Sequence, residues 1–361
     1  MTAPVLHIKG RVLVGPLEVR DELWVVGGKI SYAAPSAGAD VQTVEGWVLP
    51  GLVDAHAHVG LDANGAVDDA TSEKQAIAER DGGTLLLRDA GSPADTRWID
   101  DREDLPRIVR AGRHIARTRR YIRNYAHEIE PEDLTQYVRR EARRGDGWVK
   151  LVGDWIDRDT GDLSPCWPRE ALATAIDAAH EEGARVTAHC FGEECLRDLA
   201  TAGADCIEHA TGLLPATIDS FAAQGIAIVP TLVNIDTFPS LAASAVKYAR
   251  YAAHMNALYG TSRERVRRAY EAGVAIYTGT DAGGSLLHGL VREEITALVE
   301  AGIPQAEVIA QASWRGRQWL GFDGLSEGAA ADLIVYEADP RVDLATLYEP
   351  RRIVLRGLVI D

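Results

Sequence analysis

The chain has 361 residues, a formal net charge of −16 and 46% hydrophobic residues. This length suits one large α/β domain with a small second domain. The acidic balance argues against a nucleic-acid partner, which needs a basic surface, and the absence of a long apolar run argues against a membrane span or a membrane partner.

The N-terminus and the cysteines predict a cytoplasmic protein. The segment MTAPVLHIKGRVLVGP lacks a charged region followed by a long apolar core, so no secretory signal is expected. Cys166, Cys190, Cys195 and Cys206 show no CxxC pairing, which in a chain of this length indicates reduced thiols.

Both ends of the chain are rich in strand signals. Residues 1–49 contain short apolar stretches broken by Gly and Pro, such as LWVVGGKISYA, and residues 329–361 contain ADLIVYEADP and IVLRGLVID. Chain ends often lie close together in folded domains. We therefore predict one small β-sandwich domain formed from residues 1–49 and 329–361.

Residues 50–328 repeat a different unit. Four times an alanine-rich helical stretch is followed by a glycine and an apolar strand, at Gly183, Gly203, Gly225 and Gly273. Four earlier strands are expected in 47–58, 84–91, 108–113 and 148–154, although these units are less regular. Alternating strands and helices indicate parallel βαβ units. Eight such strands predict an α/β fold of the (βα)8 TIM-barrel type, with its active site at the carboxyl ends of the strands.

Six side chains with metal-ligand chemistry follow the predicted strands. His56 and His58 are two residues apart on one strand, so both face the same side. Imidazole and carboxylate groups that converge at one end of a barrel favour a divalent metal over simple packing. The predicted metal ligands are His56, His58, Lys150, His189, His209 and Asp281.

Lys150 needs a separate explanation because a buried ammonium group beside metal cations is strongly unfavourable. Reaction of the amine with carbon dioxide gives a carbamate, an anionic oxygen ligand that can bridge two metals. In the alternative interpretation, the flexible lysine side chain turns out to solvent.

These motifs resemble the amidohydrolase superfamily over nearly the whole chain. The resemblance includes LPGLVDAHAH, RDAG at 88–91, AHCFG, IEHA, GTDAG, the HG pair at 288–289 and EGAAADLIVYEADP. The order HxH, Lys, His, His, Asp is similar to the binuclear branch with a carboxylated lysine. The spacing from Lys150 to His209 is similar to Xaa-Pro dipeptidases and imidazolonepropionase-related amidohydrolases.

The resemblance implies two divalent metal ions, with zinc expected. His56, His58 and Asp281 would bind the buried ion, His189 and His209 the more exposed one, and carboxylated Lys150 would bridge them. Asp281 would be the catalytic residue, because it would accept a proton from a metal-bridging hydroxide and pass it to the leaving nitrogen.

The expected activity is hydrolysis of an amide C–N bond in a small-molecule substrate: a dipeptide, an N-acyl amino acid or a cyclic amide. A homo-oligomer is compatible with the resemblance. One alternative is a heterocycle deaminase with a single metal, but such relatives carry an acid where this chain has Gly192, and they lack the lysine. The other is a non-catalytic barrel relative, which would usually have lost some of the six ligands.

Residues after the predicted strands are candidates for substrate contacts. Relatives carry a GGH-like segment after strand three, whereas this chain has ARTRRYIRNYAHEIE. Trp155 either walls the pocket or packs in its loop, and His288 either contacts substrate or caps a helix. Asp89 is expected to be structural or to orient ligands, and His114 to be a surface or packing residue. The candidate substrate contacts are His127, Tyr125, Arg123, Trp155, Asn234 and His288.

Residues 102–144 contain twelve arginines despite the acidic balance of the chain. In one interpretation they form a solvated face paired with neighbouring acids. In the other, Arg117, Arg119, Arg120 and Arg123 form a clamp for a substrate carboxylate, because the planar guanidinium matches that group.

Overall fold

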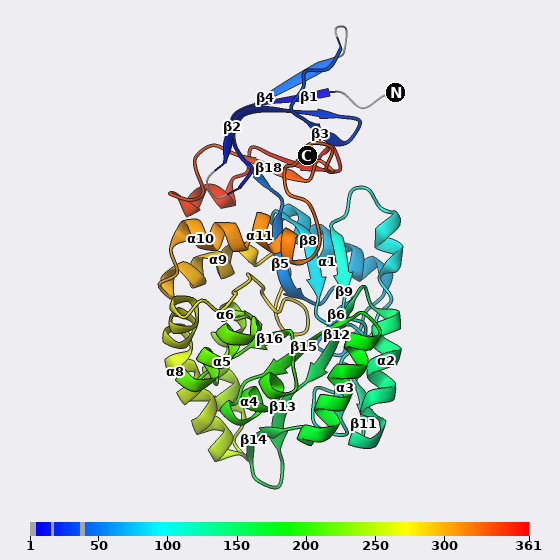
Figure 1. Ribbon diagram of the computed structural model, residues 1–361, viewed down its shortest axis with the longest axis vertical. Coiled ribbons are helices and arrows are strands. Elements are labelled where there is room, and N and C mark those ends of the chain that lie inside the picture. The colour runs from blue at the N-terminus through cyan, green and yellow to red at the C-terminus, as the bar shows by residue number, and fades with distance from the viewer. Residues whose placement is uncertain (1–4, 16–17, 37–39, 361) are drawn as a thin grey trace.

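The computed structural model describes residues 5–15, 18–36 and 40–360. Strands from both ends of the chain form one seven-stranded sheet at one end of the molecule (Figure 1). Its order is β20 (Leu358–Ile360), β19 (Arg352–Leu355), β18 (Leu333–Tyr336), β4 (Val41–Pro50), β1 (Val5–Leu13), β2 (Val19–Val26) and β3 (Lys29–Ser31).

The join between the chain ends is the antiparallel pairing of β18 with β4. β4 in turn pairs in parallel with β1, and apolar residues of these strands, such as Ile8, Val48 and Leu333, pack in one cluster. The two ends therefore belong to one sheet. The domain boundaries and the sandwich arrangement stay predictions.

The central part of the chain is a mixed α/β structure with parallel strands. One sheet has the order β5 (Leu52–Ala57), β8 (Thr84–Asp89) and β9 (Arg107–Arg110). A second has the order β11 (His127–Ile129), β10 (Ile115–Arg117), β12 (Trp148–Val152), β15 (Arg185–Cys190), β16 (Cys206–His209) and β17 (Ala227–Val229). Every strand pair within these two sheets is parallel, as the repeating unit predicts.

The segment 275–282 lies between the first and last of these strands. The Tyr277 N–H donates to Ile228 O on β17, and the Ala55 N–H on β5 donates to Thr278 O. We predicted a regular strand here, but the segment forms only isolated bridges. The reason is local: Asp281 has φ +61°, and the N–H groups of Thr280 and Asp281 both donate to His56 O, which breaks the regular ladder.

Helices connect the strands and surround them. Gly183, Gly203, Gly225 and Gly273 all have positive φ at the ends of their helices, which confirms the predicted left-handed caps. The helices are α1 (Asp69–Asp81), α2 (Leu134–Arg144), α3 (Arg169–Glu181), α4 (Glu193–Thr201), α5 (Pro215–Gln224), α6 (Leu232–Ile235), α7 (Phe238–Ser244), α8 (Ala249–Glu271), α9 (Val291–Glu300), α10 (Gln305–Gln311) and α11 (Trp314–Trp319).

Short elements complete the fold. A hairpin of β13 (Asp154–Asp157) and β14 (Asp162–Pro165) follows β12, and a smaller one of β6 (Leu61–Asp62) and β7 (Gly65–Ala66) follows β5. The 3-10 helices are η1 (Arg97–Asp101), η2 (Pro131–Asp133) and η3 (Leu344–Tyr348). Within the described ranges, none of the helices has the length and apolar character needed to cross a bilayer.

Candidate metal centre

Three of the predicted ligands meet around one point. Nε2 of His56 lies 3.1 Å from Nε2 of His58, and these two nitrogens lie 3.1 and 2.9 Å from Oδ1 of Asp281. Two ligand atoms bound to one tetrahedral zinc at about 2.0–2.1 Å would lie roughly 3.3 Å apart. The geometry of β5 and the segment before Asp281 thus suits a single ion between these side chains.

His189 and His209 form a second group beside the first. His209 Nε2 lies 3.0 Å from His189 Nδ1, and the rings of His209 and His56 are 5.2 Å apart. Ligand atoms of His56, His209 and Asp281 all lie within 4.8 Å of one another. The strand ends therefore bring five of the six predicted ligands into one contiguous cluster.

Contacts on the far side of the imidazoles determine which nitrogens face the cluster. His58 Nδ1–H donates to Gly91 O at 2.7 Å, and His209 Nδ1 hydrogen-bonds with Thr231 Oγ1 at 2.7 Å. His56 Nδ1 lies 2.7 Å from Glu208 Oε2. Such outer contacts fix the ring orientation and, for His58, the tautomer with a free Nε2 lone pair.

Lys150 lies in β12 and is only 1% exposed, so its side chain does not turn out to solvent. Among the described residues, its Nζ has no hydrogen-bond partner. Burial lowers the pKa of this amine, although Glu208 and Asp281 oppose the shift. An amine that is buried and unpaired in this way fits the predicted carbamate, since conversion to an anionic ligand would remove the cost of an isolated buried ammonium.

A buried ion pair lies below the cluster. Arg88 Nη2 donates to Glu208 Oε1 at 2.6 Å, and both side chains are fully buried. Burial raises the pKa of Glu208, but Arg88, His56 and Lys150 together lower it well below its ordinary value. Glu208 therefore presents a fixed negative charge to His56.

Several important residues were not among the predicted site residues. Arg88 and Glu208 were detectable as charged residues inside the apolar strands TLLLRD and CIEH. Asp54 joins β5 to the segment 275–282, because its Oδ1 accepts from the N–H groups of His56 and Thr280. Asp89 accepts from Gly91 N–H, and Gly91 O accepts from His58, which agrees with an orienting role for Asp89.

Of the two alternatives predicted for His114, surface or packing, the structure shows packing. It is fully buried, with its ring 5.1 Å from that of His58 and 5.4 Å from that of Tyr121. Neither ring nitrogen finds a hydrogen-bond partner within the described part of the chain. Its place beside the cluster excludes a surface position and shows a packing residue next to His58.

Two predicted substrate contacts, His127 and His288, hydrogen-bond with glutamates on helices, and a third, Arg123, is exposed. His127 Nε2 lies 2.9 Å from Glu141 Oε1 on α2, so its ring is occupied in a structural contact. His288 neither faces the ligands nor caps α9, because its Nδ1 lies 2.8 Å from Glu79 Oε1 on α1. Arg123 is exposed to solvent. Substrate contact by these three residues stays a prediction.

The other three candidates lie nearer the ligands. Asn234 Nδ2 donates to Asp281 Oδ2 at 2.8 Å, so it positions a ligand. The Trp155 ring is 5.3 Å from that of His189. Tyr125 donates to Asp62 O and packs 6.2 Å from His114.

The arginine-rich segment is mainly structural. Arg120 donates to Trp155 O at 2.9 Å and to Ser164 O at 2.8 Å, and it pairs with Asp157. Arg117 lies 3.6 Å from Glu130. At these two positions the guanidinium groups already have partners, which favours the interpretation of paired charges; a carboxylate clamp that uses Arg119 or Arg123 stays a prediction.

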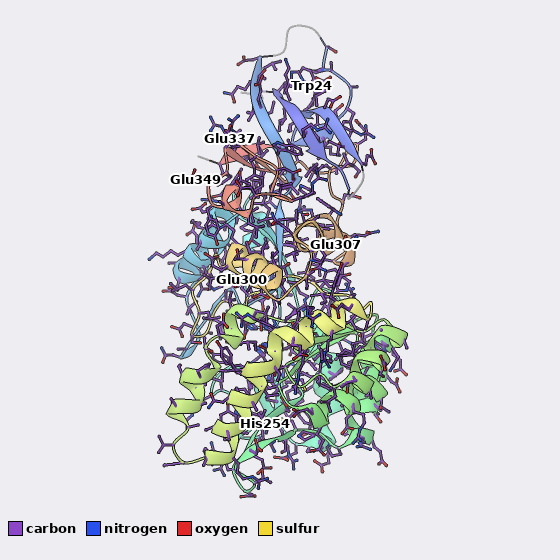
Figure 2. The ribbon with its side chains drawn as sticks, turned by 90° about the vertical axis from the view of Figure 1, so that its left-hand side faces the viewer. Trp24, His254, Glu300, Glu307, Glu337 and Glu349 are labelled. Atoms are coloured by element: carbon purple, nitrogen blue, oxygen red, sulfur yellow. The ribbon has the colours of Figure 1, made fainter. Side chains whose placement is uncertain are left out.

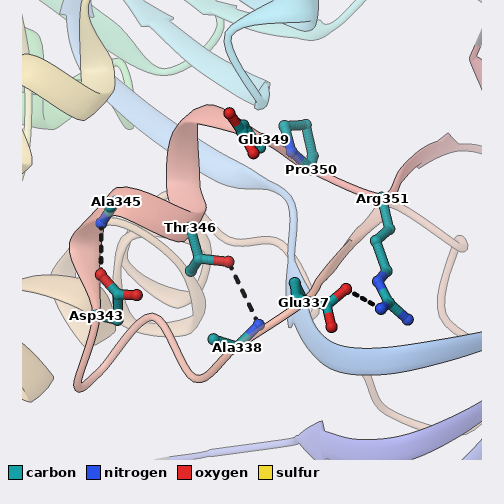
Figure 3. Close-up of a pocket in the computed structure, with 8 residues that line it drawn as sticks. All are labelled: Glu337, Ala338, Asp343, Ala345, Thr346, Glu349, Pro350 and Arg351. Carbon is teal, nitrogen blue, oxygen red and sulfur yellow. Dashed lines mark hydrogen bonds and ion pairs between the residues drawn. The ribbon is translucent and has the colours of Figure 1, made fainter.

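A cavity of about 670 Å³ lies apart from this chemistry, between β18, η3 and β19 (Figure 3). Acidic side chains and Arg351 line it, and the Thr346 hydroxyl accepts from Ala338 N–H at 3.4 Å. None of the predicted metal ligands contributes to it.

Comparison with known proteins identifies the family. The sequence profile of the amidohydrolase family matches residues 47–357. The chain belongs to the amidohydrolase family. This result confirms the resemblance that the strand-end motifs indicated, and it supports a hydrolytic enzyme.

Individual amidohydrolases and solved structures agree with this result. An uncharacterized protein of Mycobacterium tuberculosis is 52% identical over 353 residues, covering 98% of this chain and 95% of that protein. Ochratoxinase of Aspergillus niger is 26% identical over 231 residues, 62% of this chain and 47% of that protein. A Xaa-Pro dipeptidase structure with bound methionine has a TM-score of 0.83 at 22% identity, covering 99% of this chain and 100% of its own, so it shows a shared α/β fold.

Proposed function

We propose that this amidohydrolase is a metal-dependent enzyme that hydrolyses an amide C–N bond in a small molecule. The observation that carries the proposal is the convergence of His56, His58 and Asp281 beside His189 and His209. We further propose that the parallel strands close into a (βα)8 barrel, supported by the hydrogen bonds of segment 275–282 to both β5 and β17.

The residues fit two divalent ions. His56, His58 and Asp281 would hold one, His189 and His209 the other, and Lys150 as a carbamate would stand between them. Nitrogen and carboxylate ligands suit zinc. When bound, the ions would polarise a substrate carbonyl and lower the pKa of a water molecule.

Asp281 is placed to transfer a proton. Its Oδ2 is held by Asn234, its Oδ1 faces the histidines, and 21% of its side chain is exposed, against 6% for His58. A carboxylate that is both fixed and accessible can accept a proton from an attacking water and deliver it to the leaving nitrogen.

The substrate class is a proposal supported by the similar proteins. They include a Xaa-Pro dipeptidase and an ochratoxinase, and their fold and coverage match this chain. A dipeptide, an N-acyl amino acid or a cyclic amide thus stays the proposed class. The cytoplasmic location and a homo-oligomeric assembly likewise stay proposals from the sequence.

The deaminase alternative receives no support from the site. Gly192 occupies the position where such relatives carry an acid, and its N–H donates to Asp154 Oδ2 at 2.6 Å. The next residue, Glu193, lies 3.0 Å from His254 Nε2 and so is occupied away from His189.

The proposal is tested by metal analysis together with an amide assay. We expect two divalent ions per chain and hydrolysis of at least one amide in a panel of dipeptides, N-acyl amino acids and lactams. Lys150→Ala should lose activity and regain part of it with a short carboxylic acid, whereas Lys247→Ala at an exposed lysine should not change it. Full activity with one ion or none, or with an unmodified Lys150, would contradict the binuclear proposal.

A further inference from the structure

Three aromatic rings pack around His189, and two of them are partly exposed. The ring centroids of Tyr121, Trp155 and Phe191 lie 5.6, 5.3 and 4.3 Å from that of His189. Tyr121 and Trp155 also contact each other edge to face at 4.9 Å. We call Tyr121, Trp155 and Phe191 the aromatic collar.

The collar is assembled from three separate segments of the chain and is held in place. Tyr121 follows β10, Trp155 lies on β13, and Phe191 directly follows β15. Arg120 fixes the hairpin of Trp155 through Trp155 O, and Asp154 Oδ1 accepts from the Phe191 N–H at 3.0 Å. Rings that are positioned in advance lose little conformational entropy when a ligand binds.

Two of the rings are open to a ligand. Tyr121 and Trp155 are only partly buried, whereas Phe191 and His189 are buried beneath them. Partly exposed aromatic rings beside a buried chemical site offer an apolar wall at its entrance.

The collar is also uncharged. None of its three side chains carries a charge at neutral pH. Arg120, the adjoining cation, is occupied by Trp155 O, Ser164 and Asp157. A carboxylate would gain little here, whereas an aromatic ring would gain face and edge contacts.

We propose that the collar binds an aromatic ring next to the scissile bond, so that the preferred substrates are small amides with an aryl or arylalkyl group. This inference rests on the proposed hydrolase function and specifies its substrate class. Trp155 and Tyr121 are then the specificity-determining residues.

The first experiment compares matched amides in the metal-loaded enzyme. N-phenylacetyl-alanine is paired with N-acetyl-alanine, and N-(2-phenylethyl)acetamide with N-ethylacetamide, because the ring can lie on either side of the bond and the leaving amines within the second pair have similar basicity. In at least one pair, we expect kcat/KM to be about tenfold or more higher for the ring-bearing member, in keeping with the burial of one aromatic group. Trp155→Leu or Tyr121→Leu should bring this ratio close to one.

Matched controls separate the collar from general effects of losing an aromatic residue. Trp24 is partly buried and lies in the sheet of the chain ends, far from the ligands (Figure 2). Trp24→Leu should keep the wild-type ratio, and Tyr348→Leu serves in the same way for Tyr121→Leu. If Trp155→Leu does not fold, Tyr121→Leu provides the same measurement.

A binding experiment makes the inference independent of turnover. Calorimetry on the metal-loaded protein compares phenylphosphonate with methylphosphonate, and we expect at least about tenfold tighter binding of the phenyl compound. If no amide is cleaved but phenylphosphonate binds more tightly, the proposed hydrolase function is contradicted, whereas the proposed binding of an aromatic ring by the collar is supported. Equal binding of both phosphonates, or equal kcat/KM within both amide pairs, would contradict the proposal that the collar binds an aromatic ring.

Discussion

The two ends of the same parallel strands have opposite characters. At the amino ends, Trp148 and Trp319 pack edge to face at 5.1 Å, Arg185 lies 4.0 Å over Trp148, and Tyr277 stacks on Trp319 at 4.1 Å. At the carboxyl ends lie the imidazoles and the amine of Lys150, which has no partner among residues 5–15, 18–36 and 40–360. Lys150 is only two residues after Trp148 on β12.

The comparison shows how one strand can serve both stability and chemistry. Large rings close the amino end by packing. The carboxyl end has buried nitrogens that find no partner within the described part of the chain, and non-glycine residues with positive φ, such as His209 and Asp281. Such costly features persist at functional sites when the surrounding structure holds them. Arg88 joins the two regions, because it lies 4.6 Å over Trp148 and donates to Glu208.

The largest effect is expected at the carboxyl end. Asp281→Asn should lower kcat by about 10²–10⁴-fold, because the amide cannot accept the proton. The melting temperature should change little, and Asp339→Asn, at an acid paired with Arg341 in the chain-end region, should keep full activity. Near-normal turnover in metal-loaded Asp281→Asn would remove this residue from the proposed chemistry.

The amino end is tested by Trp148→Ala. This residue is 1% exposed, so the change should lower the free energy of unfolding by about 3–5 kcal/mol through loss of burial and the cavity left behind. The smaller burial of Trp24 predicts a smaller loss for Trp24→Ala in the same denaturation experiment. If Trp148→Ala instead reduced kcat/KM at full metal loading without loss of stability, it would be wrong to assign stability to the amino ends of the strands and chemistry to the carboxyl ends.

The link between the two ends is tested at Glu208. Glu208→Gln removes the charge next to His56 and should weaken metal binding by about 10–100-fold, the usual range for residues that support a metal ligand. Competition with a chelator measures this affinity without an activity assay. Glu182→Gln, at a glutamate paired with Arg143, should bind metal normally, and an unchanged affinity in Glu208→Gln would show that His56 needs no support from it.

The smallest effect is expected at the entrance. Arg123→Ala should change KM by less than about twofold, because an exposed side chain away from the ligands contributes little. Arg120→Ala should raise KM more, since it releases the hairpin that carries Trp155. If Arg123→Ala alone greatly raised the KM for acidic substrates, the interpretation of Arg123 as part of a clamp for a substrate carboxylate would be supported.

The sequence alone predicted that the histidines, Lys150 and Asp281 follow the strands, and it determined the parallel βαβ pattern and the glycine caps at Gly183, Gly203, Gly225 and Gly273. These features depend on local rules, because strand alternation sets which face a residue occupies and positive φ favours glycine. The family motifs then related the ligands to one another before any distance was known.

Only the tertiary structure decided which side chains face one another across the strands. His114 lies against His58, His127 turns to Glu141, and Arg120 ties one loop to the next hairpin. The partners in these contacts come from different strands, helices and loops. Their choice depends on side-chain direction and on how each buried polar group finds a partner, and no sequence period encodes that choice.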